Sequence, residues 1–330
     1  MKLAFIIDQL DSIKTSKDSS FAMICEAVSR NHTIHVLYQH DIVLNQNIVT
    51  GFSRTLTLTE DLQDRDWFRT SGISATPLYE FDAIVMRKDP PFDLEYVYST
   101  YLLELAESQG ALVINSPRSI RDHNEKLAIA KFPQFMAPTL VTSQPHVIRE
   151  FLSSHQDIIL KPLDGMGGAS VFRVHSADHN LNVILETLTH YGTRTIMAQR
   201  YIPEIAQGDK RILLIAGKAV PYALARIPKP GETRGNLAAG GTGRTQPLSA
   251  RDQEIVEFLG PELVKSGLML VGLDVIGDYL TEINVTSPTG MQEITKLTGF
   301  NVAGMMLDAI ENSIKYPPPC SKAIKALPEK

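Results

Sequence analysis

The chain has 330 residues, of which 43% are hydrophobic and 21% are charged, and its formal net charge is −5 at pH 7. These values are close to those of ordinary globular proteins, so the composition does not indicate a disordered chain. A slightly acidic chain whose basic residues are scattered lacks the clustered positive charge of nucleic-acid-binding proteins. This favours small-molecule partners. Two isolated cysteines, Cys25 and Cys320, exclude a disulfide framework and a cysteine zinc site.

The apolar segment that ends at Asp8 is too short for the hydrophobic core of a signal peptide and has the length of a buried strand. No apolar stretch reaches the roughly 20 residues needed to cross a bilayer. We therefore expect a cytoplasmic protein that is neither secreted nor membrane-spanning.

The first third of the chain alternates strand patterns with helix patterns. The expected strands are residues 3–8, 34–38, 83–86 and 112–115, and the expected helices are residues 20–30 and 96–109. Strands that alternate with helices predict a mainly parallel sheet covered on both faces, so the fold class of this part is α/β.

Two polar loops, residues 17–20 and 87–93, follow predicted strands of this part. Ligands of open α/β sheets bind outside the carboxyl ends of strands, so both loops are candidate substrate contacts, with Ser19 and Arg87 as the binding residues. In the first loop, Asp18 or Ser19 could equally cap the following helix, and both roles can coexist. In the second, Arg87 could form only a surface ion pair.

Residues 157–174 predict a strand, a glycine-rich loop and a second strand. The order of the glycines and the lack of a following helix exclude a P-loop. Three glycines among residues 165–168 allow backbone N–H groups to approach phosphate oxygens, although a tight hairpin turn without function is the alternative. Lys161, at the end of the apolar strand, needs an anionic partner, and this favours a phosphate site together with Lys126.

Residues 227–244 are rich in glycine, show no apolar periodicity, and are predicted to be a functional lid rather than a linker. The segment lies inside the chain, before the acidic residues that would complete the site. Arg234 and Asn236 are suited to bind a phosphorylated intermediate and a substrate amide when the lid closes and excludes water.

Residues 272–276 and 280–284 predict two antiparallel strands joined by a three-residue loop, 277–279. This loop would place Asp274 opposite Glu282, with Asn284 on the same face, so that three oxygen ligands could bind Mg²⁺. A two-residue loop would place Glu282 on the opposite face. Phosphate-binding cations, a lid and a metal-binding carboxylate cluster together indicate a ligase that activates a carboxylate with ATP.

The chain resembles the bacterial glutathione synthetases, a family of ATP-grasp ligases, over about residues 1–316. The segments that carry the resemblance are 17–23, 86–93, 160–170, 225–228, 231–241 and 280–288. Lys161 and the set Asp274, Glu282 and Asn284 are typical of ATP-grasp enzymes in general, whereas the loops of the first third and the lid narrow the resemblance to this family.

The resemblance implies an ATP-grasp fold of class α/β, in which an N-terminal parallel-sheet substrate lobe precedes two α+β lobes that hold ATP between them. The implied parts are residues 1–122, 123–202 and 203–316 with the lid 227–244, followed by a flexible tail, 317–330. The implied reaction joins γ-glutamylcysteine to glycine, with ATP and Mg²⁺ or a substituting Mn²⁺, through an acylphosphate. The implied assembly is a homotetramer.

The resemblance also implies the role of each site residue. The ATP-binding residues are Lys126, Lys161, Gly165, Met166, Gly167, Gly168, Gln199, Arg200, Tyr201, Ile202 and Asp209. The catalytic residues are Arg211, Arg226 and Arg234; the substrate contacts are Ser19, Arg87, Asn236 and Ser287; the metal ligands are Asp274, Glu282 and Asn284. Arg211 could instead end a β-ladder in solvent. The alternatives to this function are another ATP-grasp ligase and a non-catalytic nucleotide-binding module.

Overall fold

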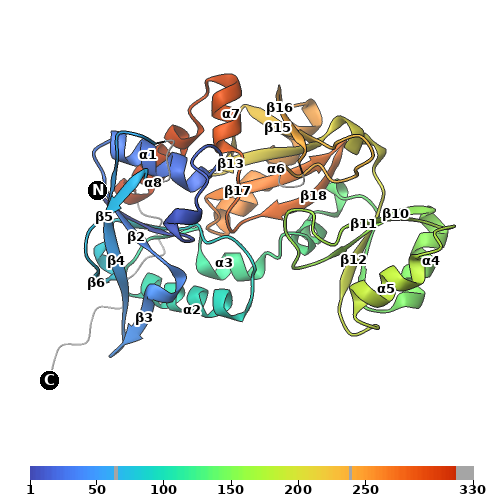
Figure 1. Cartoon of the computed structure of the whole chain (residues 1–330), viewed down its shortest axis with the longest axis horizontal. Helices are drawn as coiled ribbons and strands as arrows, with labels where there is room; N and C mark the ends of the chain where they lie inside the picture. The colour runs from blue at the N-terminus through green and yellow to red at the C-terminus, as the bar shows by residue number, and fades with distance from the viewer. Residues whose placement is uncertain (63–65, 238–239, 317–330) are drawn as a thin grey trace.

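The structure of the chain, a computed structural model, describes residues 1–62, 66–237 and 240–316. The predicted tail with Cys320 and residues 238–239 of the predicted lid lie outside the described residues. The described strands form three sheets, of eight, four and six strands, which follow one another along the chain (Figure 1).

The first sheet has the order β3-β4-β2-β1-β7-β8, with β5 and β6 also paired to β4. Its strands are β1 Lys2–Ile6, β2 Thr33–Leu37, β3 Ile42–Asn45, β4 Ile48–Leu58, β5 Phe68–Thr70, β6 Ser74–Pro77, β7 Ala83–Met86 and β8 Val113–Ile114. The predicted parallel sheet is confirmed for β2, β1, β7 and β8. The antiparallel strands β3 to β6 were missed, because β4 exposes the apolar Ile48 and Phe52 and buries the polar Ser53, so its sequence lacks the usual alternation.

Three helices accompany this sheet: α1 Ser19–Ser29, α2 Leu94–Ser108 and α3 Pro117–Asp122. The carboxylate of Asp18 accepts a hydrogen bond of 2.8 Å from the backbone N–H of Phe21, so the expected N-cap is confirmed. Asp93 caps α2 in the same way, through the N–H of Tyr96 at 2.9 Å. Both capped helix ends therefore lie where the polar loops leave the sheet.

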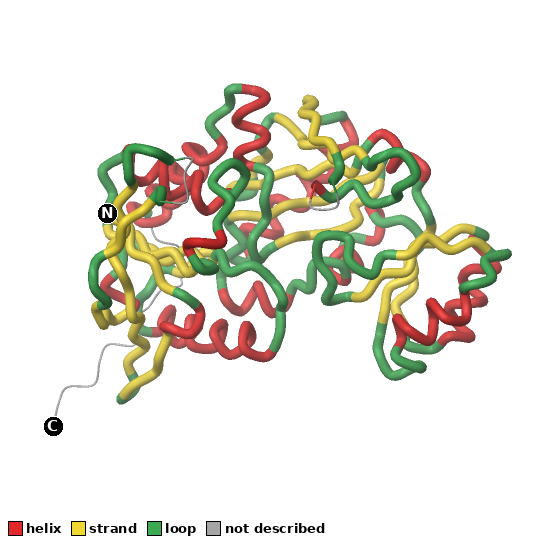
Figure 2. Tube along the Cα trace, in the orientation of Figure 1, coloured by secondary structure: helices red, strands yellow, loops and turns green. Residues whose placement is uncertain are grey.

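The second sheet is antiparallel, in the order β11-β10-β12-β9. Its strands are β9 Thr139–Thr142, β10 Asp157–Pro162, β11 Phe172–His175 and β12 Ile196–Arg200. Helices α4 Pro145–His155 and α5 Leu181–Thr189 lie along one side of this sheet (Figure 2). Their apolar side chains and those of the sheet form a separate small core. The glycine loop joins β10 to β11, as predicted.

The third sheet has the order β16-β15-β13-β17-β18, with β14 paired to β13. Its strands are β13 Asp209–Ile215, β14 Lys218–Ala219, β15 Tyr222–Ile227, β16 Thr242–Pro247, β17 Leu270–Ile276 and β18 Tyr279–Asn284. The remaining helices are α6 Ala250–Lys265, α7 Met291–Thr298 and α8 Val302–Lys315. α8 packs against α1, so the end of the described chain joins the first lobe's core.

Short 3-10 helices connect these elements: η1 Leu10–Ser12, η2 Gln39–Asp41, η3 Leu78–Glu80, η4 Leu127–Lys131, η5 Pro133–Phe135 and η6 Pro203–Gln207. Within the described residues, none of the helices combines the length and the apolar character that crossing a membrane requires.

Glu107 on α2 is a half-buried carboxyl whose pKa lies far from its usual value. Burial, and to a smaller extent the neighbouring Glu104, raise the pKa of Glu107 to about 7. Because this folded-state pKa is above that of the unfolded chain, stability is lost as the pH rises from about 4.5 to about 7. We expect Glu107→Gln to raise the free energy of unfolding by about 1 to 2 kcal/mol at pH 8 and to leave it unchanged near pH 4.

Urea unfolding at both pH values measures this difference. Glu186→Gln, the same change at an exposed position of α5, is the control and should have no effect at either pH. An equal gain at both pH values would show that the charge of Glu107 is not the cause.

Candidate active site

The β17–β18 hairpin brings Asp274 opposite Glu282, but not through the predicted loop. Ile276 pairs with Tyr279, so the turn has two residues, Gly277 and Asp278, and the prediction of a three-residue loop was wrong. A bulge at Thr281 adds one residue to β18 and restores the pairing of Asp274 with Glu282. The Thr281 hydroxyl donates to the carbonyl oxygen of Asp274 at 3.0 Å, which holds the bulge.

Asp274 is buried between two arginines. Arg211 donates to both carboxylate oxygens, at 2.5 and 2.9 Å, and Arg226 Nη2 lies 2.9 Å from Oδ2. Burial alone would raise the pKa of Asp274, but the two guanidinium groups outweigh it and hold the pKa well below its usual value. Arg211 is itself buried, so it does not end the strand in solvent.

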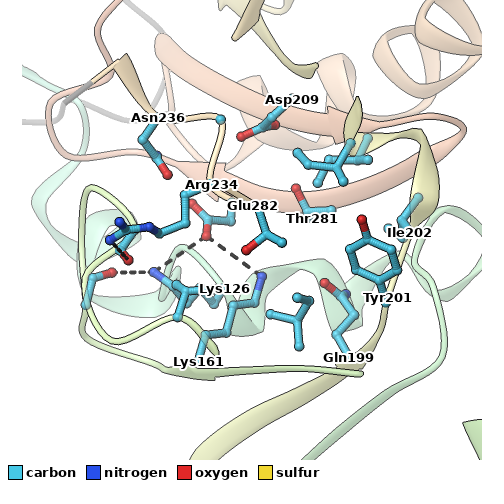
Figure 3. A pocket seen from close by; sticks show the side chains of 18 of the residues that line it. Lys126, Lys161, Gln199, Tyr201, Ile202, Asp209, Arg234, Asn236, Thr281 and Glu282 are labelled. Carbon is cyan, nitrogen blue, oxygen red and sulfur yellow. Dashed lines mark hydrogen bonds and ion pairs between the residues drawn. The ribbon is translucent and has the colours of Figure 1, made fainter. Parts of the chain in front are cut away.

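Glu282 lies between two buried lysines, as Figure 3 shows. Its Oε1 is 3.6 Å from Lys126 Nζ and 3.8 Å from Lys161 Nζ. Burial lowers the pKa of Lys161, whereas the carboxylates of Glu282 and Glu125 outweigh burial at Lys126 and raise its pKa. Two clustered cations with one shared carboxylate are suited to receive a polyanion such as a triphosphate.

A first pocket, with an empty volume of about 790 Å³, opens between the second and third sheets (Figure 3). The predicted residues that line it are Lys126, Lys161, Gly165, Gly167, Gly168, Gln199, Arg200, Tyr201, Ile202, Asp209, Arg234, Asn236 and Glu282. The structure thus brings together every predicted ATP-binding residue except Met166, which lines neighbouring pockets.

The glycine loop and the predicted lid meet at the mouth of this pocket. Arg234 donates to the carbonyl oxygen of Gly168 at 3.3 Å and pairs with Glu232 at 2.6 Å. Gly168 has a φ of +80°, and a Cβ there would lie 2.8 Å from the Asn236 side-chain oxygen. The close approach of Asn236 to the glycine loop therefore requires glycine at position 168.

The predicted lid is shorter than its expected range. Residues 242–244 belong to β16 and pair with β15, so the segment is the long connection of a β-hairpin rather than an irregular loop throughout. The polar sequence of β16 hid this strand, because its side chains are half-buried or exposed and carry no apolar alternation.

A second pocket, of about 1310 Å³, adjoins the first and shares Gly167 and Asn236 with it. Its other predicted site residues are Met166, Arg211, Arg226, Asn284 and Ser287. A side pocket continues from it past Asp18 and Asp89 to Arg87.

Arg87 is buried, with one nitrogen that has no partner. Its Nε donates to the Ser20 hydroxyl and its Nη2 to the carbonyl oxygen of Pro288, both at 3.0 Å, while Nη1 is buried without a hydrogen bond among the described residues. Arg87 therefore does not form a surface ion pair. Ser19 is also buried but lines none of these pockets, and its hydroxyl accepts from the N–H of Met291, so its predicted substrate contact stays a prediction.

Glu125 and Asp89 are among the acidic residues of the site that the sequence did not indicate. Glu125 accepts a 2.7 Å hydrogen bond from Lys126 and lines the second pocket, and burial raises its pKa. Asp89 lines the same pocket, and burial raises its pKa too. Both lie within two positions of a predicted site residue in the sequence, and this closeness is the signal that could have revealed them.

The predicted metal ligands carry oxygen atoms that suit a metal ion, but in the structure each of them interacts with other side chains. The Asn284 amide nitrogen lies 3.3 Å from Asp274 Oδ2, whereas Glu282 faces the lysines. No group of three or more His, Cys, Asp or Glu side chains suited to a metal was found in the part of the chain that the structure describes. Two carboxylates and an amide nevertheless supply the oxygen ligands that Mg²⁺ prefers.

Comparison with known proteins decides the family. Residues 1–121 match the model of the prokaryotic glutathione synthetase N-terminal domain, and residues 125–299 match that of its ATP-grasp domain. The chain belongs to the prokaryotic glutathione synthetase family. It is an ATP-dependent ligase of the ATP-grasp fold, as the sequence analysis predicted.

Relatives of this family match almost the whole chain. The glutathione synthetase of Nitrosomonas europaea is 67% identical over 315 residues, which are 95% of this chain and 98% of that protein. That of Ralstonia nicotianae is 58% identical over 95% of this chain and 96% of the relative. The solved structure of D-cycloserine synthetase DcsG shares the fold, with a TM-score of 0.66 at 14% identity over 95% of this chain and 100% of that one.

Arg173 supports the wall of the first pocket from outside. Asp157 binds its guanidinium at 2.6 Å, and the guanidinium carbon lies 3.6 Å from the centre of the Tyr201 ring, which lines the pocket. We expect Arg173→Ala to raise the KM for ATP about two- to fivefold and to leave kcat within about twofold, because a cation–π contact contributes about 0.5 to 1 kcal/mol.

Steady-state kinetics with varied ATP measures both constants. Arg149→Ala, at an exposed position of the same lobe, is the control. An unchanged KM for ATP in Arg173→Ala would show that Tyr201 keeps its position without this contact.

Proposed function

We propose that this chain makes glutathione from γ-glutamylcysteine, glycine and ATP, releasing ADP and phosphate. The observation that carries the proposal is the adjacency of the two pockets: a cleft with two buried lysines opens at Gly167 and Asn236 into a pocket with two buried arginines. A nucleotide in the first pocket would direct its phosphates toward a carboxylate in the second.

The reaction has two steps in this arrangement. The cysteinyl carboxylate oxygen attacks the γ-phosphorus, the bond from that phosphorus to the β-phosphate oxygen breaks, and ADP leaves. The glycine amine then attacks the acyl carbon of the acylphosphate, the bond to the phosphate oxygen breaks, and the nitrogen loses a proton. Such phosphoryl transfer depends mainly on positioning and charge stabilisation.

The side chains of this chain divide these tasks. Lys126 and Lys161 would bind phosphate oxygens, and Arg211 and Arg226, held by Asp274, would stabilise the transferred phosphoryl group. Arg234 would close over it from the lid, where its ion pair with Glu232 is half-exposed and free to open. Gln199, Arg200, Tyr201 and Ile202 would line the adenine, and Asp209 would contact the ribose.

We also propose that Asp274, Glu282 and Asn284 hold Mg²⁺, with Mn²⁺ as a substitute, once phosphate oxygens occupy the lysines and arginines that now bind the two carboxylates. The metal ion would neutralise charge on the phosphates. The cytoplasmic location rests on the two isolated cysteines, and the homotetramer rests on the family resemblance, so both remain proposals.

The test is release of phosphate from ATP and Mg²⁺ with γ-glutamylcysteine, with and without glycine, together with detection of glutathione by mass. Phosphate and glutathione should appear together only with all substrates present. Nucleotide binding without this product would show that the chain is another ATP-grasp ligase or a non-catalytic module.

A further inference from the structure

The second pocket has several acidic residues on its wall, and one of them is not engaged by another side chain. The acidic residues are Asp18, Asp89, Glu125 and Glu293. The Asp18 carboxylate caps α1, and the Glu125 carboxylate accepts a hydrogen bond from Lys126. The Asp89 carboxylate interacts with the Ser287 hydroxyl and with Arg87. Glu293, on α7, differs from these three.

One carboxylate oxygen of Glu293 is buried without a partner. Its Oε2 has no hydrogen bond among the described residues. Burial raises the pKa of Glu293 and Asp18 adds to the increase, against the opposing effects of its own backbone N–H, Lys17 and Arg211. A buried oxygen that has lost its water and gained no donor is costly, so it favours a ligand that brings a positive charge or a proton.

Glu293 lies beside the arginine that is proposed to hold the transferred phosphoryl group. Arg211 Nη1 donates to the carbonyl oxygen of Thr289 at 3.4 Å. Gly290 packs on the stem of the same arginine, since a Cβ there would lie 3.5 Å from Arg211 Cγ. Residue 293 follows Gly290 by three positions, so its side chain lies on the side of α7 that faces this contact.

Hydrogen bonds and packing fix this end of α7. The Gln292 side chain donates to the carbonyl oxygens of Thr15 at 2.8 Å and Asp18 at 2.5 Å, which ties α7 to the loop before α1. Ile294, the next residue after Glu293, is fully buried in the core. The Glu293 carboxylate is therefore held at the pocket wall by a rigid element, as acid–base chemistry requires.

We propose that Glu293 binds the ammonium group of glycine and takes the proton that this group must lose before it attacks the acylphosphate. The inference rests on the proposed function and names a catalytic residue for its second step. An ammonium ion has no lone pair, so glycine cannot attack until a base removes one proton. Lys17 lines the same pocket and carries the charge that suits the carboxylate of the same zwitterion.

Protons and electrons balance in this step. The ammonium group gives one proton to Oε2 of Glu293, and the nitrogen lone pair forms the bond to the acyl carbon. The bond from that carbon to the phosphate oxygen breaks, and its electron pair stays on the phosphate. A second proton moves from the nitrogen to this phosphate, which leaves as hydrogen phosphate. Glu293 then returns its proton to solvent.

Single-turnover kinetics of Glu293→Gln test the proposal, because the change keeps the shape of the side chain and removes its ability to accept the proton. ADP should form at a rate within about twofold of the natural chain, since the first step does not use this proton. Glutathione should form at least about 100-fold more slowly, because a positioned base contributes about 10²- to 10⁴-fold. Glu257→Gln, at an exposed position of α6, is the control and should alter neither rate.

The pH dependence of glutathione formation separates proton transfer from a structural role. In Glu293→Gln only glycine that is already unprotonated can react, so the rate should rise about tenfold for each pH unit between about pH 7 and pH 9. In the natural chain Glu293 supplies the base, so the rate should change little over the same range.

Other results would overturn the inference. Glutathione formation at the natural rate in Glu293→Gln would show that another group accepts the proton. An equal loss of ADP formation would assign Glu293 to the first step, and a slow second step that does not respond to pH would give it a structural role only. A natural chain that makes no glutathione would overturn the proposed function itself, and the inference with it.

Discussion

Arg87→Met should raise the KM for γ-glutamylcysteine about 100-fold and leave the KM for ATP within about twofold. Arg87 is buried in the side pocket, and its Nη1 has no partner among the described residues. Burial lowers the pKa of Arg87 although Asp18 and Asp89 nearby act to raise it, and among the described residues no anion is hydrogen-bonded to its guanidinium. A substrate carboxylate would supply that anion, and losing such a buried charged contact costs about 2 to 5 kcal/mol of binding free energy.

The same variant should unfold with a free energy within about 1 kcal/mol of the natural chain. Replacing a buried and incompletely bonded charge by an apolar side chain of similar length is often neutral, although Ser20 and Pro288 each lose a hydrogen bond. Steady-state kinetics and urea unfolding measure both quantities, and Arg118→Met, at an exposed position of α3, is the control. A stable Arg87→Met with unchanged KM for γ-glutamylcysteine would remove Arg87 from the substrate site.

Local patterns in the sequence were sufficient to place the parts of this site. Glycine spacing placed the loop of Gly165 to Gly168, and the strand β10 that precedes it, where the structure has them. The cap of α1 and the polar loops of the first lobe were predicted as well, because each depends on residues only a few positions apart. The family models then confirmed the family and the fold.

The hairpin of Asp274 and Glu282 shows where such patterns fail. Counting residues in alternation predicted a three-residue loop, yet the real turn has two residues and the bulge at Thr281 supplies the third. The prediction that the two carboxylates face each other was confirmed, whereas the predicted loop length was wrong. A bulge is stabilised by contacts such as the Thr281 hydroxyl bond to Asp274 O, and alternation of apolar residues does not reveal it.

Partners distant in sequence were equally hidden. Asp274 and Arg211 are 63 residues apart, and their contact depends on the pairing of β13 with β17. From the sequence we therefore assigned Asp274 to a metal ion and Arg211 to a phosphate, with no link between them. In the structure Asp274 also positions both arginines, which gives one residue two tasks that a substitution will affect together.

Asp274→Asn should consequently lower both activity and stability by large amounts. The change keeps the shape of the side chain but removes the negative charge that Arg211 binds at 2.5 Å and that lies 2.9 Å from Arg226. Leaving the buried Arg211 without its ion-pair partner costs about 3 to 5 kcal/mol of unfolding free energy, whereas Arg226 keeps its ion pair with Asp209. We expect kcat to fall by at least about 1000-fold, because the charges that act on the phosphoryl group are no longer held in position.

Asp278→Asn, the same change at the exposed turn of the same hairpin, should alter neither quantity. Unfolding measured without metal separates the two tasks of Asp274, since the arginine pairing acts in the metal-free protein while metal binding does not. If Asp274→Asn loses activity but keeps the stability of the natural chain without metal, Asp274 acts only through a metal ion. If both fall as expected, the ion pairs at Asp274 are part of how the fold presents Arg211 and Arg226 to the phosphate.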